Sequence, residues 1–552
     1  MAAAVFLLLM AGYMVSFSYD ENDALDTAYW MERGEILLLL EFRHLVQRML
    51  PLWLWQGLHA VGFNASAMLL LNLWDFATAA ASLMLLYRVL RLIPVSRAVS
   101  FWATFAYGTA HCVWVYTGSG RLYSTSMLLV FGAYYAALQL EHIESPRARW
   151  LLVIVSATLT CFACLFWLVH VINAIGVGLL IFSLPAAADW KRRSAHLAAY
   201  GAFGIVLTLA ISVACLMYVQ IPLEGPAIKA WMDAAGTQPV QFDRLSPMKA
   251  SYGQAHGILV MYELPFMING LMRDDPHLLR VGSLPWQLGK FIFVWVLLLL
   301  VYVYPLAVLW RASARQRILI LCLYVPLGIN MVFGLGWLGS DAQRFMPSML
   351  SQFALGALAV QNWMEHSRRP RLLASALILC LSFIAADNLF ESLLPSQRRY
   401  QQLAENIKAI RGQVKPADLL VTFGRDVSIT YLTMIRYYAG PQFLTTTNDG
   451  ATYHWDSPRW QEQFHAHVRA AGQRGGRLFL MDRMAVGLNP ARAAWGEVQH
   501  PHPTVREFAA WVQREYCVTP RFFVGADQYF EVGPRSSPCP AGALSPAAEA
   551  RP

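Results

Sequence analysis

Long apolar stretches separated by short charged segments dominate the first 394 residues of the chain. A membrane-spanning helix needs about 20 consecutive, mostly apolar residues. The stretches that approach or exceed this length are 2–17, 65–87, 98–117, 123–140, 151–184, 196–219, 288–310, 318–337, 345–363 and 372–390. The first has neither the basic flank nor the small-residue cleavage site of a signal peptide, so we interpret it as a span. The pattern predicts an α-helical polytopic membrane protein.

The run Leu151–Leu184 decides the topology. As one helix it would be about 50 Å long, against a hydrocarbon core of roughly 30 Å. If it is split near Phe166–Trp167 and the N-terminus is cytoplasmic, every basic cluster between spans falls on the cytoplasmic side, as positive charges do in membrane proteins. This gives about eleven spans. The clusters are Arg88/Arg91/Arg97, Arg147/Arg149, Lys191/Arg192/Arg193, Arg311/Arg315/Arg317 and Arg368/Arg369/Arg371.

This topology divides the chain into a transmembrane domain, residues 1–394, and a soluble outer domain, residues 395–534, followed by a flexible tail at 535–552. The transmembrane domain carries outer loops at 18–64 and 220–287. In the outer domain, strand-like and helix-like segments alternate, which predicts a small α/β domain. The strand-like segments are 419–423, 443–445, 478–481, 522–524 and 529–532, and the helix-like ones are 428–438, 459–471 and 505–515.

Composition excludes several classes of protein. Charged residues make up 14% of the chain and apolar residues 57%, and the mean hydropathy is +0.41, so the chain is neither disordered nor a simple soluble enzyme. The net charge is +9, but the basic residues lie in short clusters between spans, which indicates orientation rather than nucleic-acid binding. Cys517 and Cys539 both lie in the outer domain, where an oxidising compartment permits a disulfide; the sequence leaves this pairing open.

Charged residues at the outer boundary of the membrane are the candidates for chemistry, because charges there are costly and tend to be functional. Asp20 and Glu21 directly follow the first predicted span, while Arg121 and Arg344 lie in two short outer turns. A carboxylate can accept the proton of an incoming hydroxyl, and an arginine can hold a departing phosphate. The set therefore suits transfer from a lipid phosphate to a hydroxyl.

Three short motifs resemble those of the C-type (GT-C) glycosyltransferases, a family that includes the protein O-mannosyltransferases and the bacterial aminoarabinose transferase of lipid A. They are Tyr19-Asp20-Glu21-Asn22-Asp23-Ala24 after the first span, Arg121-Leu122-Tyr123 before a later one, and Gln343-Arg344-Phe345-Met346-Pro347 before a late one. The chain departs from the family at Gly118-Ser119-Gly120, where a Glu is often found. No metal site is predicted, although the sequence leaves a divalent metal open.

The resemblance implies a glycosyltransferase of the bacterial inner membrane, with a periplasmic C-terminal domain and no cofactor. It would move a hexosyl or pentosyl group from a polyprenyl-phosphate donor to a lipid, glycan or protein acceptor, with inversion. Asp20 would be the general base, with Asp23 as the competing candidate, and Arg344 and Arg121 would meet the donor phosphate. The other implied substrate contacts are Glu21, His44 and Tyr123. The implied partners are the donor, the acceptor and membrane lipids, with no nucleic acid.

Other interpretations stay open. The alternatives for the chain as a whole are a transporter or flippase of a lipid-linked glycan, and a polymerase or ligase of surface polysaccharide. The three acids near residue 20 can be solvated charges at a helix end, and the two arginines can be anchors at the membrane interface. Asp75, in the middle of a span, is either a proton relay or, as we favour, the partner in a helix–helix hydrogen bond.

Overall fold

The computed structural model separates into two compact units, and each is described by itself. One contains residues 1–18 and 30–397, and the other contains residues 19–29 and 398–552. The structure describes residues 22–40, 44–184, 189–234, 247–260, 284–310, 312–336, 342–394, 397–398, 405, 407, 410, 412–422, 442–445, 459–481, 505–524, 527–535, 539 and 543–544.

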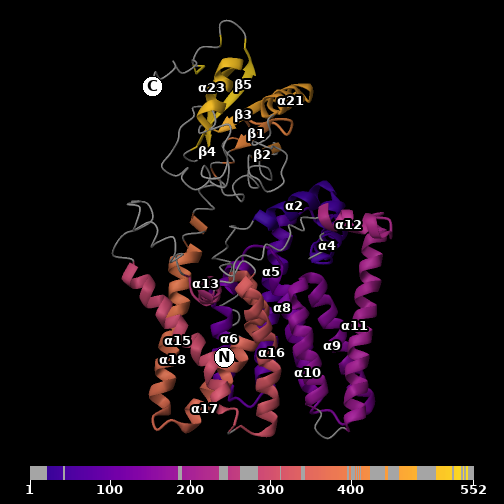
Figure 1. The fold of residues 1–552 in the computed structure, drawn as a ribbon, viewed down its shortest axis with the longest axis vertical. Coiled ribbons are helices and arrows are strands. Elements are labelled where there is room, and N and C mark those ends of the chain that lie inside the picture. Colours follow the sequence, from indigo (N-terminus) through magenta and orange to yellow (C-terminus); the bar gives the residue numbers. More distant parts are fainter. Residues whose placement is uncertain are drawn as a thin grey trace. The chain divides into compact units, whose positions relative to one another are not determined.

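Helices make up the first unit (Figure 1). Among the described residues, six are long and apolar enough to cross a membrane: Ala67–Leu92, Pro146–Phe166, Trp190–Tyr218, Leu288–Ala307, Ala314–Leu335 and Pro370–Leu393. The chain is thus a helical multi-pass membrane protein, as predicted, while the total of about eleven spans stays a prediction. The predicted span 2–17 lies outside the described residues. Residues 22–29 of helix α2 Asn22–Arg33 belong to the second unit and residues 30–33 to the first. The other helices of the first unit, in the part of the chain that the structure describes, are α3 Ile36–Leu39, α4 Met49–Ala60, α5 Ala67–Leu92, α6 Arg97–Gly108, α7 His111–Thr117, α8 Tyr123–Gln139, α9 Pro146–Phe166, η2 Leu168–His170, α10 Val171–Ser183, α11 Trp190–Tyr218, α12 Gly225–Ala234, α13 Pro247–Ile258, α15 Leu284–Val308, α16 Ala314–Gly336, η4 Ala342–Ser348, α17 Met349–His366, α18 Pro370–Asp387 and η5 Asn388–Leu393.

The long apolar run is divided at Trp167 into α9 and α10, which run in opposite directions. Trp150, near the start of α9, packs on His196 near the start of α11, with ring centroids 4.6 Å apart. The start of α11 follows closely on the end of α10, so α9 begins at the end of the bundle where α10 finishes. The run is therefore divided near Phe166–Trp167, as predicted, whereas its two crossings of the membrane stay a prediction.

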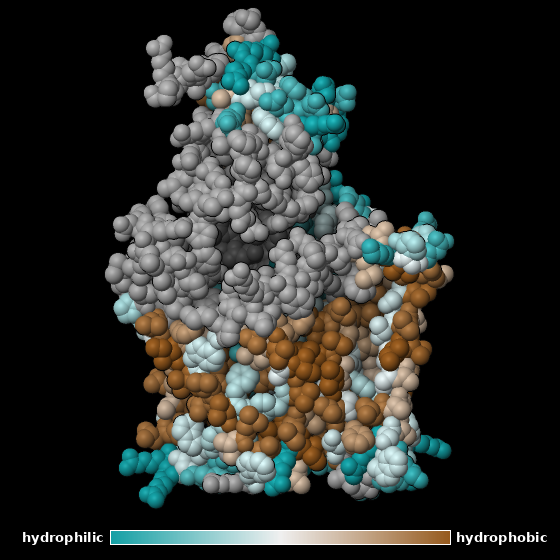
Figure 2. All heavy atoms as spheres, in the orientation of Figure 1, coloured by the Kyte–Doolittle hydropathy of each residue, from teal (hydrophilic) through white to brown (hydrophobic). Residues whose placement is uncertain are grey.

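The basic clusters gather at one end of this helical unit. Arg315 bonds to Glu141 at 2.8 Å and donates to the carbonyl of Leu92 at 2.9 Å. The amide of Ser96 donates to Gln361 at 2.9 Å. On the face drawn in Figure 2, an apolar band covers the membrane helices and hydrophilic residues collect beyond its lower edge. This charge asymmetry is the one on which the predicted topology depends.

One predicted span is interrupted. The stretch 98–117 forms two helices, α6 and α7, because Ala110 is extended, with φ −62° and ψ 137°. The carbonyl of Thr109 at this break accepts a 2.7 Å hydrogen bond from the side chain of Asn388. An interhelical side chain thus satisfies a backbone group that a continuous helix would have bonded internally.

The second unit contains a five-stranded sheet in the order β2-β1-β3-β5-β4. β1 pairs in parallel with β2 and with β3, and β5 is antiparallel to β3 and β4. Helices α21 and α23 supply Phe464, Phe508 and Trp511 to the core of this unit. The predicted small α/β domain is confirmed, although the helix-like segment 428–438 lies outside the described residues. The bounds are β1 Leu419–Thr422, β2 Gln442–Thr445, α21 Trp460–Gln473, β3 Leu478–Met481, α23 Val505–Glu515, β4 Tyr516–Val524 and β5 Asp527–Pro534.

A disulfide closes this unit. Cys517 on β4 is bonded to Cys539, with the two Cα atoms 5.6 Å apart. The amide of Leu544 donates to the carbonyl of Val518 at 2.8 Å. These two links fasten residues beyond β5 to the edge strand β4, which shields part of an edge that would otherwise be free.

Candidate functional site

The candidate site lies at the end of the helical unit opposite the basic clusters, because α8 runs from the turn that carries Arg121 to the end that carries Glu141. Arg121 stands between two residues with left-handed backbone, Gly120 at φ 73° and Leu122 at φ 64°. A left-handed conformation at a branched residue such as Leu122 costs on the order of 1–3 kcal/mol. Strain of this kind persists only where surrounding contacts hold it.

The guanidinium of Arg121 is held by a residue far away in the sequence. Its Nη1 donates to Oε1 of Gln343 at 2.8 Å, and the hydroxyl of Tyr123 donates to the same oxygen at 3.3 Å. The guanidinium carbon also lies 5.6 Å from the ring centroid of Tyr116 and 5.9 Å from that of Tyr123. Gln343 therefore joins the two turns that carry the predicted site residues Arg121 and Arg344.

Arg344 follows Gln343 directly in η4, the short helix Ala342–Ser348, and its side chain is half-buried. The fold of η4 is fixed by contacts of two residues that follow Arg344. The ring of Phe345 packs on Gly334 so closely that a Cβ added there would lie 2.8 Å from the ring. The side-chain amide of Asn173 donates to the carbonyl of Pro347 at 2.9 Å. The Arg344 backbone is thus held beside the bonded pair Arg121–Gln343.

The segment after residue 43 closes a third side of the site. The Nδ1 of His44 lies 2.9 Å from the carbonyl oxygen of Phe166, and the amide of Val46 donates to the carbonyl of Leu165 at 3.2 Å. These contacts satisfy carbonyls left over at the end of α9. Gln47 donates to the backbone carbonyl of Arg121. His44 thus anchors this segment, with its ring centroid 6.4 Å from that of Tyr123.

A layer of aromatic and polar side chains supports the site from within the helices. The rings of Tyr123 and Trp167 are 4.5 Å apart, and Trp167 packs edge-on against His170 at 5.4 Å. The two ring nitrogens of His170 lie 2.9 Å from Ser126 Oγ and 3.1 Å from Asn173 Nδ2. His170 is a fully buried, hydrogen-bonded core residue, as its position on an apolar helix predicts.

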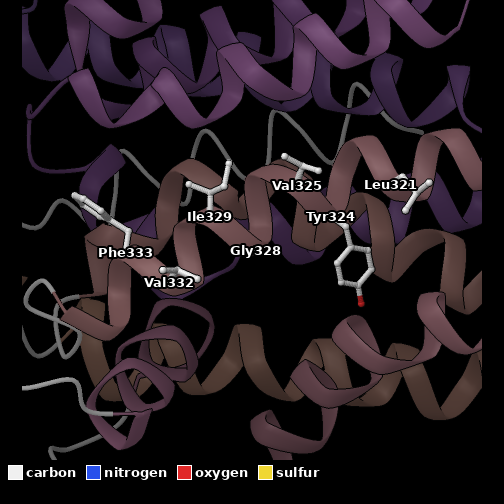
Figure 3. Close-up of a pocket in the computed structure, with 7 residues that line it drawn as sticks. All are labelled: Leu321, Tyr324, Val325, Gly328, Ile329, Val332 and Phe333. Atoms are coloured by element: carbon white, nitrogen blue, oxygen red, sulfur yellow. The ribbon is translucent and has the colours of Figure 1, made fainter.

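An apolar groove runs along α16 next to η4. It has a volume of about 610 Å³, and all seven of its lining residues lie on α16 (Figure 3): Leu321, Tyr324, Val325, Gly328, Ile329, Val332 and Phe333. From Leu321 to Phe333 the helix rises about 18 Å. The next residue along the helix, Gly334, is the one on which Phe345 of η4 packs. The groove therefore leads along the helix toward the segment that carries Arg344.

The structure unites some of the predicted site residues. Arg121, Tyr123 and His44 lie around one point, and Arg344 adjoins it through Gln343. Asp20 and Glu21 lie outside the described residues, and Asp23 is in α2 with its side chain outside the description. Among the described residues, no three His, Cys, Asp or Glu side chains gather to hold a metal ion.

Sequence reasoning missed the two glutamines that hold Arg121. Gln343 lies directly before Arg344 in one of the three motifs, so its place in that motif could have marked it as a candidate site residue. Gln47 carried no signal, because a single glutamine in an outer loop is ordinary. Asp75 was expected to make a helix–helix hydrogen bond, and this is confirmed, because it contacts Ser124 and the amide of Leu122 at the start of α8.

The fold of this chain is similar to the folds of two solved membrane proteins, ArnT and an archaeal oligosaccharyltransferase. It is similar to ArnT from Cupriavidus metallidurans in a structure bound to undecaprenyl phosphate, with a TM-score of 0.54, 11% identity, and 96% of this chain and 97% of that chain covered. The apo structure of the same ArnT matches with a TM-score of 0.54, 11% identity and 96% and 98% coverage.

An oligosaccharyltransferase from Archaeoglobus fulgidus is also similar, with a TM-score of 0.50, 10% identity, and 98% of this chain and 74% of that chain covered. No protein-family model matches the chain, and no curated protein matches it in sequence. At these identities the structural likeness establishes the fold, while the activity rests on the site.

Proposed function

We propose that this protein is a glycosyltransferase that moves a sugar from a polyprenyl-phosphate donor to a hydroxyl of a lipid, glycan or protein on the periplasmic face of a bacterial inner membrane. The observation that carries the proposal is the bond between Arg121 and Gln343. It joins two outer turns, each with an arginine, on a fold shared with a protein bound to undecaprenyl phosphate.

The two arginines suit the charge that develops in such a reaction. As the bond between the anomeric carbon and the phosphate oxygen breaks, negative charge accumulates on the departing lipid phosphate. Arg121 and Arg344 would hold that phosphate, since guanidinium groups make strong charge-assisted hydrogen bonds to phosphate oxygens. Two cations at this position lower the energy of the departing group more than that of the intact donor, and this accelerates transfer.

The acceptor hydroxyl needs a base for its proton. Asp20 is the proposed base and Asp23 the second candidate, both from the sequence motif that follows the first predicted span. Attack on the face opposite the departing phosphate inverts the anomeric centre. Glu21, His44 and Tyr123 would contact the substrates, with Tyr123 placed by its bond to Gln343.

The donor's isoprenoid chain would lie in the apolar groove of α16. That groove offers only one hydroxyl among its lining side chains, on Tyr324, so it fits a hydrocarbon and not a sugar. Because it leads toward η4, a chain lying in it would bring its phosphate to the arginine-bearing turns. Entry from the side would let the donor stay in the bilayer throughout.

We also propose residues 1–394 as the transmembrane domain and 395–534 as a periplasmic domain, with 535–552 as its tail. The bond between Cys517 and Cys539 supports this placement. Disulfides persist in oxidising compartments such as the periplasm and are rare in the cytoplasm.

The test is a mass spectrum of total lipids and surface glycans from cells that carry the wild type, a deletion, Asp20→Asn or Arg121→Gln. Arg317→Gln is the matched control, because Arg317 lies at the basic end and is exposed. We expect a hexose- or pentose-sized mass to disappear in the deletion, Asp20→Asn and Arg121→Gln strains and to persist in the control.

Other results would contradict parts of the proposal. If the deletion loses the product while Asp20→Asn keeps it, Asp20 is not the base and Asp23 is tested next. If a lipid-linked precursor accumulates on one leaflet and the Asp20 and Arg121 variants behave as wild type, the protein is a transporter and the proposed transfer is wrong.

A further inference from the structure

Asp75 is a fully buried acid on α5 that contacts the turn carrying Arg121. Its Oδ2 accepts a 3.2 Å hydrogen bond from the amide of Leu122, and its Oδ1 contacts the hydroxyl of Ser124. Leu122 is the residue before α8, so the carboxylate serves as an N-terminal cap supplied by another helix. The positive end of the α8 dipole favours an acid at this point.

The turn that Asp75 contacts adopts an unfavourable backbone. Leu122 has φ 64°, a left-handed conformation that side chains with a Cβ resist. Gly120 has φ 73°, and a Cβ added there would lie 2.9 Å from Oδ1 of Asn72, one turn before Asp75 on α5. The side of α5 that carries Asn72 and Asp75 therefore accommodates the left-handed turn 120–122 when residue 120 is a glycine.

Arg121 lies between these two strained residues, and contacts secure it at three points. Gln47 bonds to its carbonyl, Gln343 accepts from its guanidinium at 2.8 Å, and Asp75 accepts from the amide of the next residue at 3.2 Å. The bonds of Gln47 and Asp75 both act on the peptide unit between Arg121 and Leu122, and the bond to Asp75 acts directly at the amide of Leu122. Loss of the Asp75 bond would let Leu122 relax toward an ordinary conformation and turn Arg121 away from Gln343.

We propose that Asp75 is a positioning residue, which holds the left-handed turn 120–122 so that the guanidinium of Arg121 faces the donor phosphate. The inference rests on the proposed function for the role of the phosphate, but the geometry of the turn stands by itself. It assigns the buried acid to the site rather than to helix packing alone. A packing role would affect the stability of the helical unit without affecting its preference for a phosphorylated lipid.

The experiment measures lipid binding by the full-length protein in nanodiscs, using undecaprenyl phosphate and the uncharged undecaprenol as probes. Native mass spectrometry gives the affinity for each probe and so their ratio. The variants are Asp75→Leu, Asp75→Asn, Ser124→Ala, Arg121→Gln and the double variant of Asp75→Leu with Arg121→Gln. Ser82→Ala is the control, since Ser82 is buried on the same helix and bonds to the carbonyl of Ala79 at 2.7 Å. Hydrogen exchange of residues 118–124 reports the turn directly.

We expect Asp75→Leu to lower the preference for undecaprenyl phosphate about tenfold, as loss of a hydrogen bond to a charged group does. Exchange of the Leu122 amide should rise in the same variant. Asp75→Asn should retain most of the preference, because an amide can accept from Leu122 and donate to Ser124. The double variant should lose no more than Arg121→Gln alone, because both changes remove the same contact.

Ser124→Ala should lower the preference two- to threefold, and it supplies the test if Asp75→Leu does not fold. If Asp75→Leu folds and its preference for undecaprenyl phosphate is unchanged, the inference is wrong. If Asp75→Leu does not fold, an unchanged preference in Ser124→Ala overturns the inference. If Arg121→Gln keeps the preference while Asp75→Leu still speeds exchange at Leu122, Arg121 does not hold the phosphate. In that case the proposed function fails at Arg121 while the positioning of the turn stands.

Discussion

Gly176 on α10 lies directly against Tyr134 of α8 and Pro326 of α16. A Cβ added there would overlap the hydroxyl of Tyr134 and lie 2.6 Å from Cγ of Pro326. Both neighbours are fixed, Tyr134 by burial and Pro326 by its ring. A methyl group at residue 176 must therefore push two helices away from α10.

We predict that Gly176→Ala destabilises the helical unit by about 1–3 kcal/mol, the usual effect of overpacking a tight core. Thermal unfolding in detergent would show a lower midpoint. Gly201→Ala on α11 is the matched control, because nothing lies within 4 Å of a Cβ there. If the unfolding midpoint falls equally in both variants, the cause is the general effect of replacing glycine by alanine and not the close approach of Tyr134 and Pro326 to Gly176.

A second prediction at this scale concerns His467 on α21. Burial lowers the pKa of its imidazole, and the charge of Arg474 lowers it further. The folded unit therefore binds a proton at His467 less readily than the unfolded chain does, so its stability falls as pH drops below the ordinary histidine pKa of about 6.5. His467→Gln should reduce this acid loss, measured as unfolding midpoints of the full chain between pH 7 and 5. An unchanged pH slope would refute it.

For single residues, the sequence could identify the charged candidates of the site but not the side chains that bond to them. Arg121 and Arg344 stood out because a charge at a membrane boundary is costly. Their connection through Gln343 arises from a contact between turns 222 positions apart, which no local pattern encodes. The left-handed Leu122 was also unpredictable, since tertiary contacts with Asp75 override the local preference of leucine.

Among the helices, α15 and α18 are linked by a buried ion pair. Lys290 Nζ lies 3.0 Å from Oδ2 of Asp387, and the two side chains are 1% and 4% exposed. Such a pair contributes little net stability, because taking both charges out of water offsets their attraction. Removing one partner is different, since it leaves the other charge buried alone.

We therefore predict that Lys290→Met destabilises the protein by about 3–5 kcal/mol, whereas the double variant with Asp387→Leu recovers most of that loss. Thermal unfolding of Lys290→Met, Asp387→Leu and the double variant gives the coupling energy between Lys290 and Asp387. Additive losses across the three variants would contradict the prediction.

Helices and strands were the part of the fold most open to prediction from sequence. The apolar length of each span and the alternation in the C-terminal region are local properties, so α11, α16, α23 and β3 appear close to where the pattern places them. The break between α6 and α7 was not predictable, because Asn388, far away in the chain, satisfies the carbonyl that the break exposes.

On the scale of the whole molecule, the two ends of the helical unit should face different compartments. Ser313 lies in the turn before α16 at the basic end, and Val61 follows α4 at the end that carries Arg121. Both are exposed. Because positive charge favours the cytoplasm, only residue 61 should face the periplasm.

We predict that a membrane-impermeant maleimide labels Val61→Cys in intact cells and labels Ser313→Cys only after the inner membrane is permeabilised. The wild type is the control for its own cysteines, and those that the structure describes as free are buried or half-buried. If Ser313→Cys is labelled in intact cells and Val61→Cys only after permeabilisation, the topology is the reverse of the predicted one and the site does not face the periplasm.

The division of the long apolar run at Trp167 has a consequence for how the protein is made. Helix α10 has 13 residues and is about 20 Å long, too short to cross a hydrocarbon core of roughly 30 Å by itself. No polar loop separates it from α9. The two helices must therefore enter the bilayer from the translocon together, as a helical hairpin. The basic residues that follow α10 fix the orientation of this hairpin once they have been synthesised.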